Sequence, residues 1–259
     1  MPAVADLPAL ADRLRSLHDA RPLVLPNVWD AASAQTFAGA GFGALATGSA
    51  SVAATLGYDD HQAMPVDEAF AAVARITRVV DVPVSADLEA GYGLPPAEFV
   101  ERLLDAGAVG CNLEDTDHAA GDGSLLDIDA QAAYLAAVVD AAASAGVPIV
   151  LNARVDTYAR RAGATPEERF ESTIDRARAY RAAGASCIYP ILAADDAVGP
   201  LAAAIDAPVN ALHRSGGPTL GELGALGVAR ITFGSGLHRV AMNAVEATAT
   251  ALAAGKEPT

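Results

Sequence analysis

Val82-Pro83-Val84-Ser85-Ala86-Asp87-Leu88-Glu89-Ala90-Gly91-Tyr92-Gly93 joins an apolar, β-rich run to two carboxylates and a Gly-Tyr-Gly turn. The run predicts a strand over residues 82–89. Because successive side chains of a strand point to opposite faces, Asp87 and Glu89 are expected to share one face. Two neighbouring acids repel each other unless a cation or a shared proton separates them. Mg²⁺ favours a few carboxylate oxygens plus water, so the pair is a candidate Mg²⁺ site at a strand end.

Short β-rich runs alternate with alanine-rich helical segments along the whole chain of 259 residues. Strands are expected at residues 23–29, 44–49, 82–89, 109–115, 148–156, 186–191, 208–212 and 229–234. Helices fit between them, for example at residues 65–80, 96–106, 130–145, 166–183 and 219–226. Such alternation is typical of a parallel sheet with right-handed crossovers, and eight units predict a closed (β/α)8 TIM barrel. We expect a single domain over residues 1–259, with a short N-terminal helix and a C-terminal helix.

The composition limits the classes of partner. Hydrophobic residues make up 52% of the chain, which is ample for a large core, and the formal net charge is −15. So strong a negative charge argues against nucleic acid and anionic membranes as partners. A small anionic carboxylate substrate would therefore need local help from a metal, an arginine or helix N-termini.

Neither a targeting segment nor a membrane span is expected. The N-terminus carries charged residues in an amphipathic helical pattern, unlike a signal peptide. The most apolar stretch, from Ala132 to Leu151, contains Asp140 and Pro148 and is typical of a helix, a turn and a strand. Cys111 and Cys187 lie in apolar strand-like runs and are expected to be buried thiols, so a cytoplasmic location is the default.

Polar residues collect where the expected strands end. The set comprises Asn27, Trp29, Asp30, Thr47, Gly48, Ser49, Ala50, Tyr58, Asp59, Asp60, His61, Asp87, Glu89, Asn112, Glu114, Asp115, Asn152, Arg154, Asp156, Asn210, His213 and Arg214. In a (β/α) barrel the active site lies at these ends. Any one of the residues could equally be a satisfied structural polar group, but one shared site explains the whole set better.

Several blocks, taken in order, resemble the isocitrate lyase/phosphoenolpyruvate mutase superfamily from about Pro26 to the final helix. The blocks are Asn-Val-Trp-Asp-Ala-Ala-Ser-Ala at residues 27–34, the segment 41–60, Asp-Leu-Glu-Ala-Gly-Tyr-Gly at 87–93, Asn-Leu-Glu-Asp at 112–115 and the arginine at 154. The resemblance implies a (β/α) barrel that binds Mg²⁺, with Mn²⁺ as an alternative, and a 2-oxo or 2-hydroxy carboxylate. The metal in such an enzyme stabilises the enolate left when a C–C or P–C bond breaks.

The resemblance also implies roles for individual residues. For the metal it implies Asp87, Glu89, which stands where the family usually has a second aspartate, and Glu114, the outer acid that holds metal-bound water. For catalysis it implies Arg154, whose planar fork suits substrate oxygens, and the loop aspartate Asp60. Substrate binding is expected from the loop stretch Thr47, Gly48, Ser49 and Ala50, and from Trp29, Asn112 and Asn210 at other strand ends.

The loop after the fourth expected strand departs from the family. Lyases for isocitrate and methylisocitrate carry a Lys-(Lys/Arg)-Cys-Gly-His loop whose cysteine is the catalytic acid, whereas residues 114–126 here contain neither cysteine nor lysine. Cleavage of isocitrate or methylisocitrate is therefore not expected. His118 is the candidate replacement acid, because histidine titrates near neutrality, and a solvated loop histidine is the alternative.

Three functions stay open. The leading hypothesis is a Mg²⁺-dependent lyase that cleaves a C–C bond of a small 2-oxo or 2-hydroxy carboxylic acid through a metal-stabilised enolate. The alternatives are a phosphonopyruvate-type mutase or hydrolase that acts on a P–C bond, and a non-catalytic metabolite-binding barrel without a proton donor.

Family members are commonly tetramers that exchange a C-terminal helix. A homo-oligomer, dimer or tetramer, is expected, although one final helix leaves little material for such an exchange.

Overall fold

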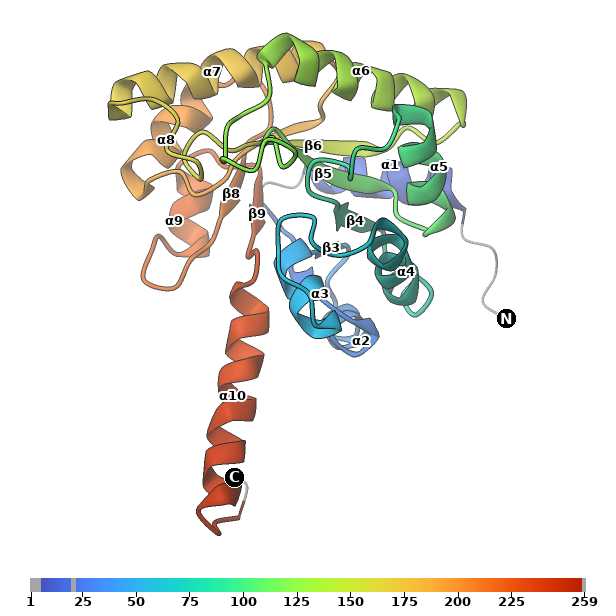
Figure 1. Cartoon of the computed structure of the whole chain (residues 1–259), viewed down its shortest axis with the longest axis vertical. Coiled ribbons are helices and arrows are strands. Elements are labelled where there is room, and N and C mark those ends of the chain that lie inside the picture. Colours follow the sequence, from blue (N-terminus) through green and yellow to red (C-terminus); the bar gives the residue numbers. More distant parts are fainter. Residues whose placement is uncertain (1–5, 20–21, 258–259) are drawn as a thin grey trace.

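Parallel strands form a closed barrel in the computed structural model, which describes residues 6–19 and 22–257 (Figure 1). The strands are β1 Leu23–Val24, β2 Asn27–Val28, β3 Leu45–Thr47, β4 Val84–Asp87, β5 Gly110–Glu114, β6 Val150–Val155, β7 Cys187–Pro190, β8 Asn210–Leu212 and β9 Arg230–Thr232. β1 and β2 are two halves of one strand, since β1 pairs with β9 and β2 pairs with β3. An isolated bridge between Ile188 and Val209 joins β7 to β8 and completes the ring. The predicted (β/α)8 barrel is confirmed.

Helices cover the outside of the ring. They are α2 Ala31–Gly39, α3 Ser49–Leu56, α4 Val66–Thr77, α5 Pro96–Asp105, α6 Ile128–Ser144, α7 Pro166–Ala182, α8 Asp195–Ala204 and α9 Leu220–Ala225. Local sequence fixes where several of them begin. At α7, for example, Thr165 and Glu168 form a reciprocal capping box, and Pro166 occupies the first turn. The expected helix positions agree with the structure to within three residues at the helix termini.

The N-terminal helix α1 (Leu7–Leu17) closes the floor of the barrel. Its Leu14 is fully buried, and a Cβ added to Gly110 at the start of β5 would lie 2.8 Å from Leu14 Cδ2. Arg15 Nη2 donates to the carbonyl oxygen of Pro148, at 2.5 Å, just before β6 begins. Glycine at 110 therefore makes room for the helix, and the opposite, C-terminal end of the strands stays open.

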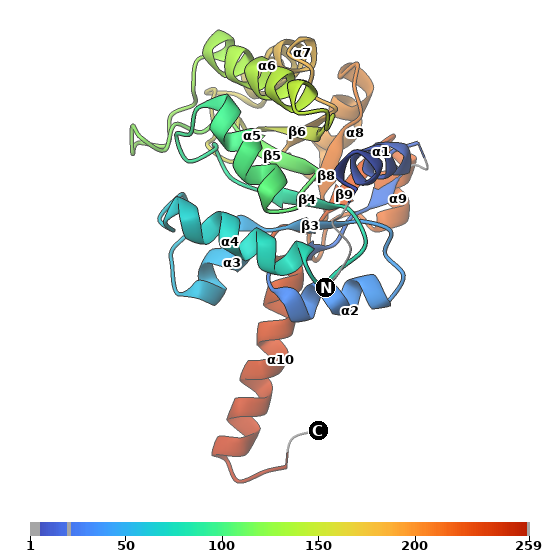
Figure 2. The same ribbon diagram turned by 90° about the vertical axis from the view of Figure 1, so that its right-hand side faces the viewer.

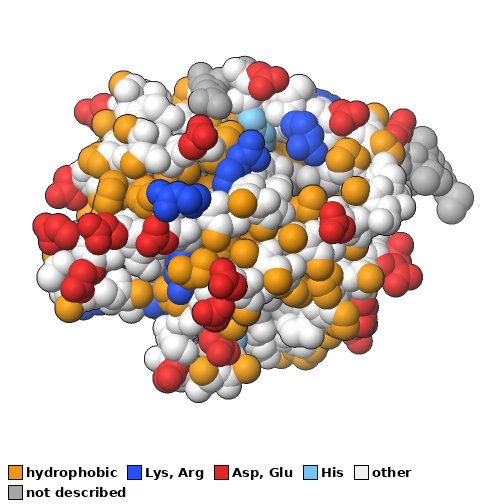
Figure 3. All heavy atoms as spheres, turned by 90° about the horizontal axis from the view of Figure 1, so that it is seen from above, with side chains coloured by type: hydrophobic (Ala, Val, Ile, Leu, Met, Phe, Trp, Pro, Cys, Tyr) orange, Lys and Arg blue, Asp and Glu red, His pale blue; other side chains and the backbone are white. Residues whose placement is uncertain are grey.

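The C-terminal helix α10 (Gly236–Ala253) stands away from the barrel in both ribbon views (Figures 1 and 2). It has no buried residue, and Val240, Met242 and Val245 are 67%, 47% and 56% exposed. It is a single helix of 18 residues after the last strand, as the sequence predicted. Across the described residues, no helix combines the length and apolarity needed to cross a membrane. The face on which α6 and α7 lie carries scattered acidic side chains and fewer basic ones (Figure 3), in keeping with the net charge.

Cys111 and Cys187 are both buried and are not joined by a disulfide, as predicted. The expectation that Asp87 and Glu89 share one strand face is wrong, because β4 ends at Asp87. Glu89 lies beyond the strand with φ of +53°, in the left-handed region, so alternation of strand faces does not apply to it.

Candidate metal and substrate site at the strand ends

A cavity of about 450 Å³ opens at the C-terminal ends of the strands. Six residues to which the sequence assigned a metal, catalytic or substrate-binding role line it: Gly48, Ser49, Ala50, Asp60, Asp87 and Arg154. They come from four different loop or strand ends, after β3, after α3, on β4 and on β6. The barrel therefore brings together residues that lie more than 100 positions apart in the sequence.

Asp87 is held in place by residues at the end of the neighbouring strand, β3, and just after it. Its Oδ2 accepts hydrogen bonds from Ser49 N at 3.1 Å and Ser49 Oγ at 3.0 Å. Its backbone N–H donates to Thr47 Oγ1 at 2.8 Å. Gly48 lies between them in a crowded place, since an added Cβ would be 3.2 Å from Gly234 O. The other oxygen, Oδ1, is buried and has no hydrogen-bond partner among the described residues.

Glu89 is buried beside Asp87. Its Oε2 accepts from Gln62 N at 2.7 Å, and its Oε1 accepts from the Tyr92 hydroxyl at 2.9 Å. Burial, and then the nearby charges of Glu114, Asp60 and Asp87, raise the pKa of Glu89 to about 7. A cation at this place would relieve the repulsion.

Glu114 and Arg154 form a buried ion pair between β5 and β6. Arg154 Nη1 lies 2.6 Å from Glu114 Oε2, and Arg154 Nε donates to Asp156 Oδ1 at 2.6 Å. Burial raises the pKa of Glu114, and the charge of Arg154 opposes that rise. With two neighbouring acids fixing it, the guanidinium has a defined orientation at the edge of the cavity.

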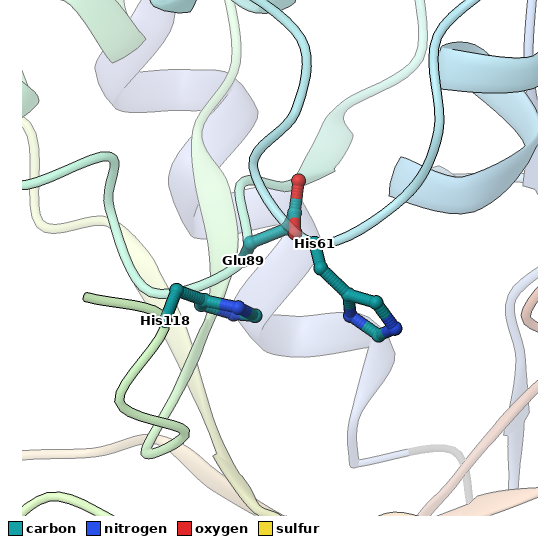
Figure 4. A group of neighbouring side chains, drawn as sticks. All are labelled: His61, Glu89 and His118. Atoms are coloured by element: carbon teal, nitrogen blue, oxygen red, sulfur yellow. The ribbon is translucent and has the colours of Figure 1, made fainter. Parts of the chain in front are cut away.

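His118 does not line the main cavity. Its Nε2 lies 2.6 Å from Glu114 Oε1, and its ring lies beside that of His61, with centroids 5.8 Å apart. Burial alone would lower the pKa of His118, but the hydrogen bond and charge of Glu114 outweigh it and the pKa is raised. His61, Glu89 and His118 together form a cluster in which one potential ligand atom from each lies within 4.8 Å of the others (Figure 4).

Four residues that were predicted to bind substrate lie away from this cavity. Thr47 is buried and positions Asp87, as described above. Trp29 packs edge-on against the His238 ring at 5.0 Å. Asn112 Oδ1 accepts from Asn152 Nδ2 at 2.7 Å, and Asn210 Oδ1 accepts from Thr232 Oγ1 at 3.1 Å, both inside the barrel. None of the four is among the described residues that line the cavity.

Several lining residues did not follow from the sequence. Arg160, Ser235 and Arg239 line the cavity, and Arg214, which the sequence placed only just beyond a strand end, lies there too. Arg160 Nε donates to Thr116 Oγ1 at 3.1 Å, and Arg214 Nη2 contacts Asp195 Oδ1 at 2.5 Å. These arginines make the outer wall basic. The sequence contains one sign of a role for Arg239. It lies one helical turn after Ser235, at the start of the final helix.

The residues present fit a divalent cation. Asp87 Oδ1 is a buried acceptor with no partner in the described part of the chain, and three further acids, Asp60, Glu89 and Glu114, lie around it. Carboxylate oxygens are the ligands that Mg²⁺ prefers. Asp87 and Glu89 would hold such an ion, with Glu114, already engaged by Arg154 and His118, in an outer position.

A barrel with carboxylates and an arginine at its strand ends defines a class of enzymes, and comparison with known proteins identifies the family. Residues 14–253 match the family model described as phosphoenolpyruvate phosphomutase. The chain belongs to this family, within the phosphoenolpyruvate mutase/isocitrate lyase superfamily. The resemblance noted from the sequence blocks is thereby confirmed.

Individual relatives extend over nearly the whole chain. An uncharacterized protein of Mycobacterium tuberculosis (strain ATCC 25618 / H37Rv) is 34% identical over 93% of this chain and 88% of its own length. A crystal structure from Burkholderia cenocepacia J2315, provisionally named a phosphonomutase, is 43% identical, with a TM-score of 0.86 over 93% of this chain and 98% of that one. Oxaloacetate acetylhydrolase in complex with the inhibitor 3,3-difluorooxalacetate is 26% identical, with a TM-score of 0.86 over 98% of this chain and 90% of that one.

Proposed function

We propose that the protein is a divalent-metal-dependent lyase that cleaves a C–C bond of a small 2-oxo or 2-hydroxy carboxylic acid. The observation that carries the proposal is the unpartnered, buried Asp87 Oδ1 at the wall of a cavity that Arg154 also lines. An orphaned anionic oxygen is costly unless a cation binds it. Similarity to oxaloacetate acetylhydrolase supports the same class of substrate.

In this proposal, different residues bind the metal and the substrate. Asp87 and Glu89 would hold Mg²⁺, which when bound supplies Lewis-acid polarisation of substrate oxygens. Arg154 presents its fixed guanidinium to a substrate carboxylate or carbonyl oxygen. Ser49 and the backbone around it lie against the same cavity. Asp60, on the loop after α3, lines the wall and stays the proposed loop acid.

The basic outer wall favours a substrate with a second anionic group. Arg160 and Arg239 line the cavity, and neither forms an ion pair with an acid of the described residues. One carboxylate would bind near Asp87 and Arg154, and the other near these two arginines. Oxaloacetate or a substituted malate meets this requirement, whereas a monocarboxylic oxo acid does not.

The test is turnover of a panel of oxo and hydroxy acids with Mg²⁺ and with Mn²⁺. We expect metal-dependent cleavage of at least one dicarboxylic acid by the wild-type protein and none by Asp87→Ala. Identical rates for the two proteins across the panel would overturn the proposal. Tight binding of Mg²⁺ and oxalate without any turnover would instead favour the non-catalytic barrel.

A phosphonate substrate is the second candidate, and the 43% identity to the provisionally named phosphonomutase favours it. The arginines of the outer wall would suit a phosphonate as well as a carboxylate. Release of inorganic phosphate from phosphonopyruvate, or its conversion to phosphoenolpyruvate, would establish this P–C chemistry. Absence of both products, together with cleavage of a dicarboxylic acid, would exclude it.

We also infer that the protein is a cytoplasmic homo-oligomer, a dimer or a tetramer. Buried thiols support the location. Helix α10 supports the assembly, because its apolar side chains Val240, Met242 and Val245 have no contact partner inside one chain that buries them. A second copy of the chain is the partner that would cover them.

A further inference from the structure

Three loops bring a mixed nitrogen and oxygen ligand set together. His61 lies on the loop between α3 and α4, Glu89 follows β4, and His118 follows β5 (Figure 4). One potential ligand atom from each lies within 4.8 Å of the other two. Among the described residues, no other group of three or more histidine, cysteine or acidic side chains meets this criterion, and the group excludes Asp87.

Glu114 orients the ring of His118 for metal binding. Its Oε1 lies 2.6 Å from His118 Nε2, while its other oxygen lies 2.6 Å from Arg154 Nη1. When the ring is neutral and Nε2 donates to the Glu114 carboxylate, Nδ1 keeps a lone pair that can bind a metal. Histidines that bind metals almost always donate the other ring N–H to a carboxylate or carbonyl in this way.

The backbone around the cluster is held in an uncommon conformation. His61, Gln62, Glu89 and Tyr92 all have φ between +53° and +68°, in the left-handed region. This conformation lets Gln62 N and the Tyr92 hydroxyl clamp the two oxygens of Glu89 at 2.7 and 2.9 Å. Non-glycine residues in this region persist only where the surrounding structure fixes them, and they concentrate at ligand clamps.

A separate cavity gives an ion access to the cluster. Its volume is about 480 Å³, and its lining includes His61, Tyr92 and His118. His61 also lines the main cavity, so its ring lies between the two spaces. The cluster is therefore reached from a cavity that Asp87 does not line.

We propose that His61, Glu89 and His118 form a transition-metal site, which shares Glu89 with the proposed Mg²⁺ site but does not use Asp87. Two imidazole nitrogens and one carboxylate suit ions such as Zn²⁺, Fe²⁺ or Co²⁺, whereas Mg²⁺ prefers oxygen ligands. Three protein ligands leave further coordination positions for water or a small molecule. The proposal does not depend on lyase activity, and in it His118 is a metal ligand and not a proton donor.

Titration of the chelator-stripped full chain with Co²⁺, followed by visible absorption, tests the proposal. We expect one Co²⁺ per chain with ligand-field bands that Zn²⁺ abolishes. His61→Gln and His118→Gln should each weaken Co²⁺ binding by more than the roughly 10- to 100-fold that removal of an outer hydrogen-bond partner costs. Glu114→Gln should fall within that roughly 10- to 100-fold range. His61 is exposed, so its variant is not expected to disturb folding.

Two control variants decide between the sites. His213→Gln removes a histidine of the main cavity that is outside the cluster, and Asp87→Asn removes the carboxylate proposed for Mg²⁺. Both should leave Co²⁺ affinity and spectrum unchanged. Equal Co²⁺ binding by the wild type and both cluster-histidine variants would overturn the proposal, as would loss of binding in Asp87→Asn alone. None of these Co²⁺ titrations measures turnover. Their outcome therefore does not depend on whether the protein is a lyase.

Discussion

Arg154 and Glu114 are direct neighbours in the register of β6 and β5, and their side chains form an ion pair of 2.6 Å at the upper edge of the barrel. The side chain of Arg154 is 13% exposed and that of Glu114 is 1% exposed. Asp156, the residue after the end of β6, binds the same guanidinium. One arginine thus neutralises two buried acids and also faces the cavity.

Replacing Arg154 by methionine should lower both stability and activity. The change leaves Glu114 and Asp156 buried without their cation, and breaking a buried pair in this way typically costs about 3–5 kcal/mol in the free energy of unfolding. Urea denaturation measures the loss. The matched control is Arg178→Met, which removes an exposed pair with Asp175 and should change stability by less than about 0.5 kcal/mol. Equal effects of the two substitutions would contradict the assigned role of the pair.

Asp87→Asn should abolish Mg²⁺ binding while leaving the fold intact. The amide has the shape of the carboxylate, and its oxygen can still accept from Ser49, but it lacks the charge. Turnover should fall by about 100-fold or more, the size of effect seen when one charge-stabilising group is removed from an active site. Calorimetric Mg²⁺ titration and steady-state kinetics check this. Asp67→Asn, at an exposed ion pair with Arg102, serves as control, and unchanged Mg²⁺ affinity in Asp87→Asn would refute the assignment.

Stability should fall in acid because of His18. Burial first, and then the charge of Arg230, lower the pKa of this histidine from 6.5 to about 4. The unfolded chain, with the ordinary pKa, then binds the proton more strongly, so the free energy of unfolding decreases as pH falls from about 6.5 to about 4. The full window corresponds to roughly 3 kcal/mol. Urea denaturation at several pH values should show a shallower decrease for His18→Gln; identical slopes would contradict the prediction.

A charge on α10 should change the mass of the protein in solution. Val245→Glu places a carboxylate among Val240, Met242 and their neighbours, where a second copy would have to bury it. Size-exclusion chromatography with light scattering should show an oligomer for the wild type and a smaller species for the variant. Thr248→Glu, at an exposed polar position of the same helix, is the control. A monomeric wild type would disprove the assembly.

Sequence patterns predicted the barrel well because its signals are local. The apolar runs, and the glycine turns that follow the helices, each consist of consecutive residues. Every expected strand is present, although the observed strands are somewhat shorter. Asp87 and Arg154 reach the cavity for the same reason: each lies on a strand, where alternation and the open end of the barrel determine its position.

Features that depend on a residue leaving its strand, or on contacts across the barrel, were not predictable. Glu89 adopts a left-handed conformation just after β4, which no alternation rule anticipates. Asn112 and Asn210 hydrogen-bond to Asn152 and Thr232 inside the barrel and do not line the cavity. The contribution of Arg239 required knowing where α10 begins relative to β6. The pairing of His61 with His118 required two loops to meet.

Pairing of Leu23 in β1 with Arg230 in β9 closes the ring between its first and last strands. During synthesis β1 emerges early, whereas its partner β9 is made only after almost the entire chain. Until β9 is available, both β1 and β8 present unsatisfied strand edges, which are templates for pairing with other chains. Completion of the barrel is therefore a late event, and a nascent chain that stalls before residue 230 is exposed to aggregation.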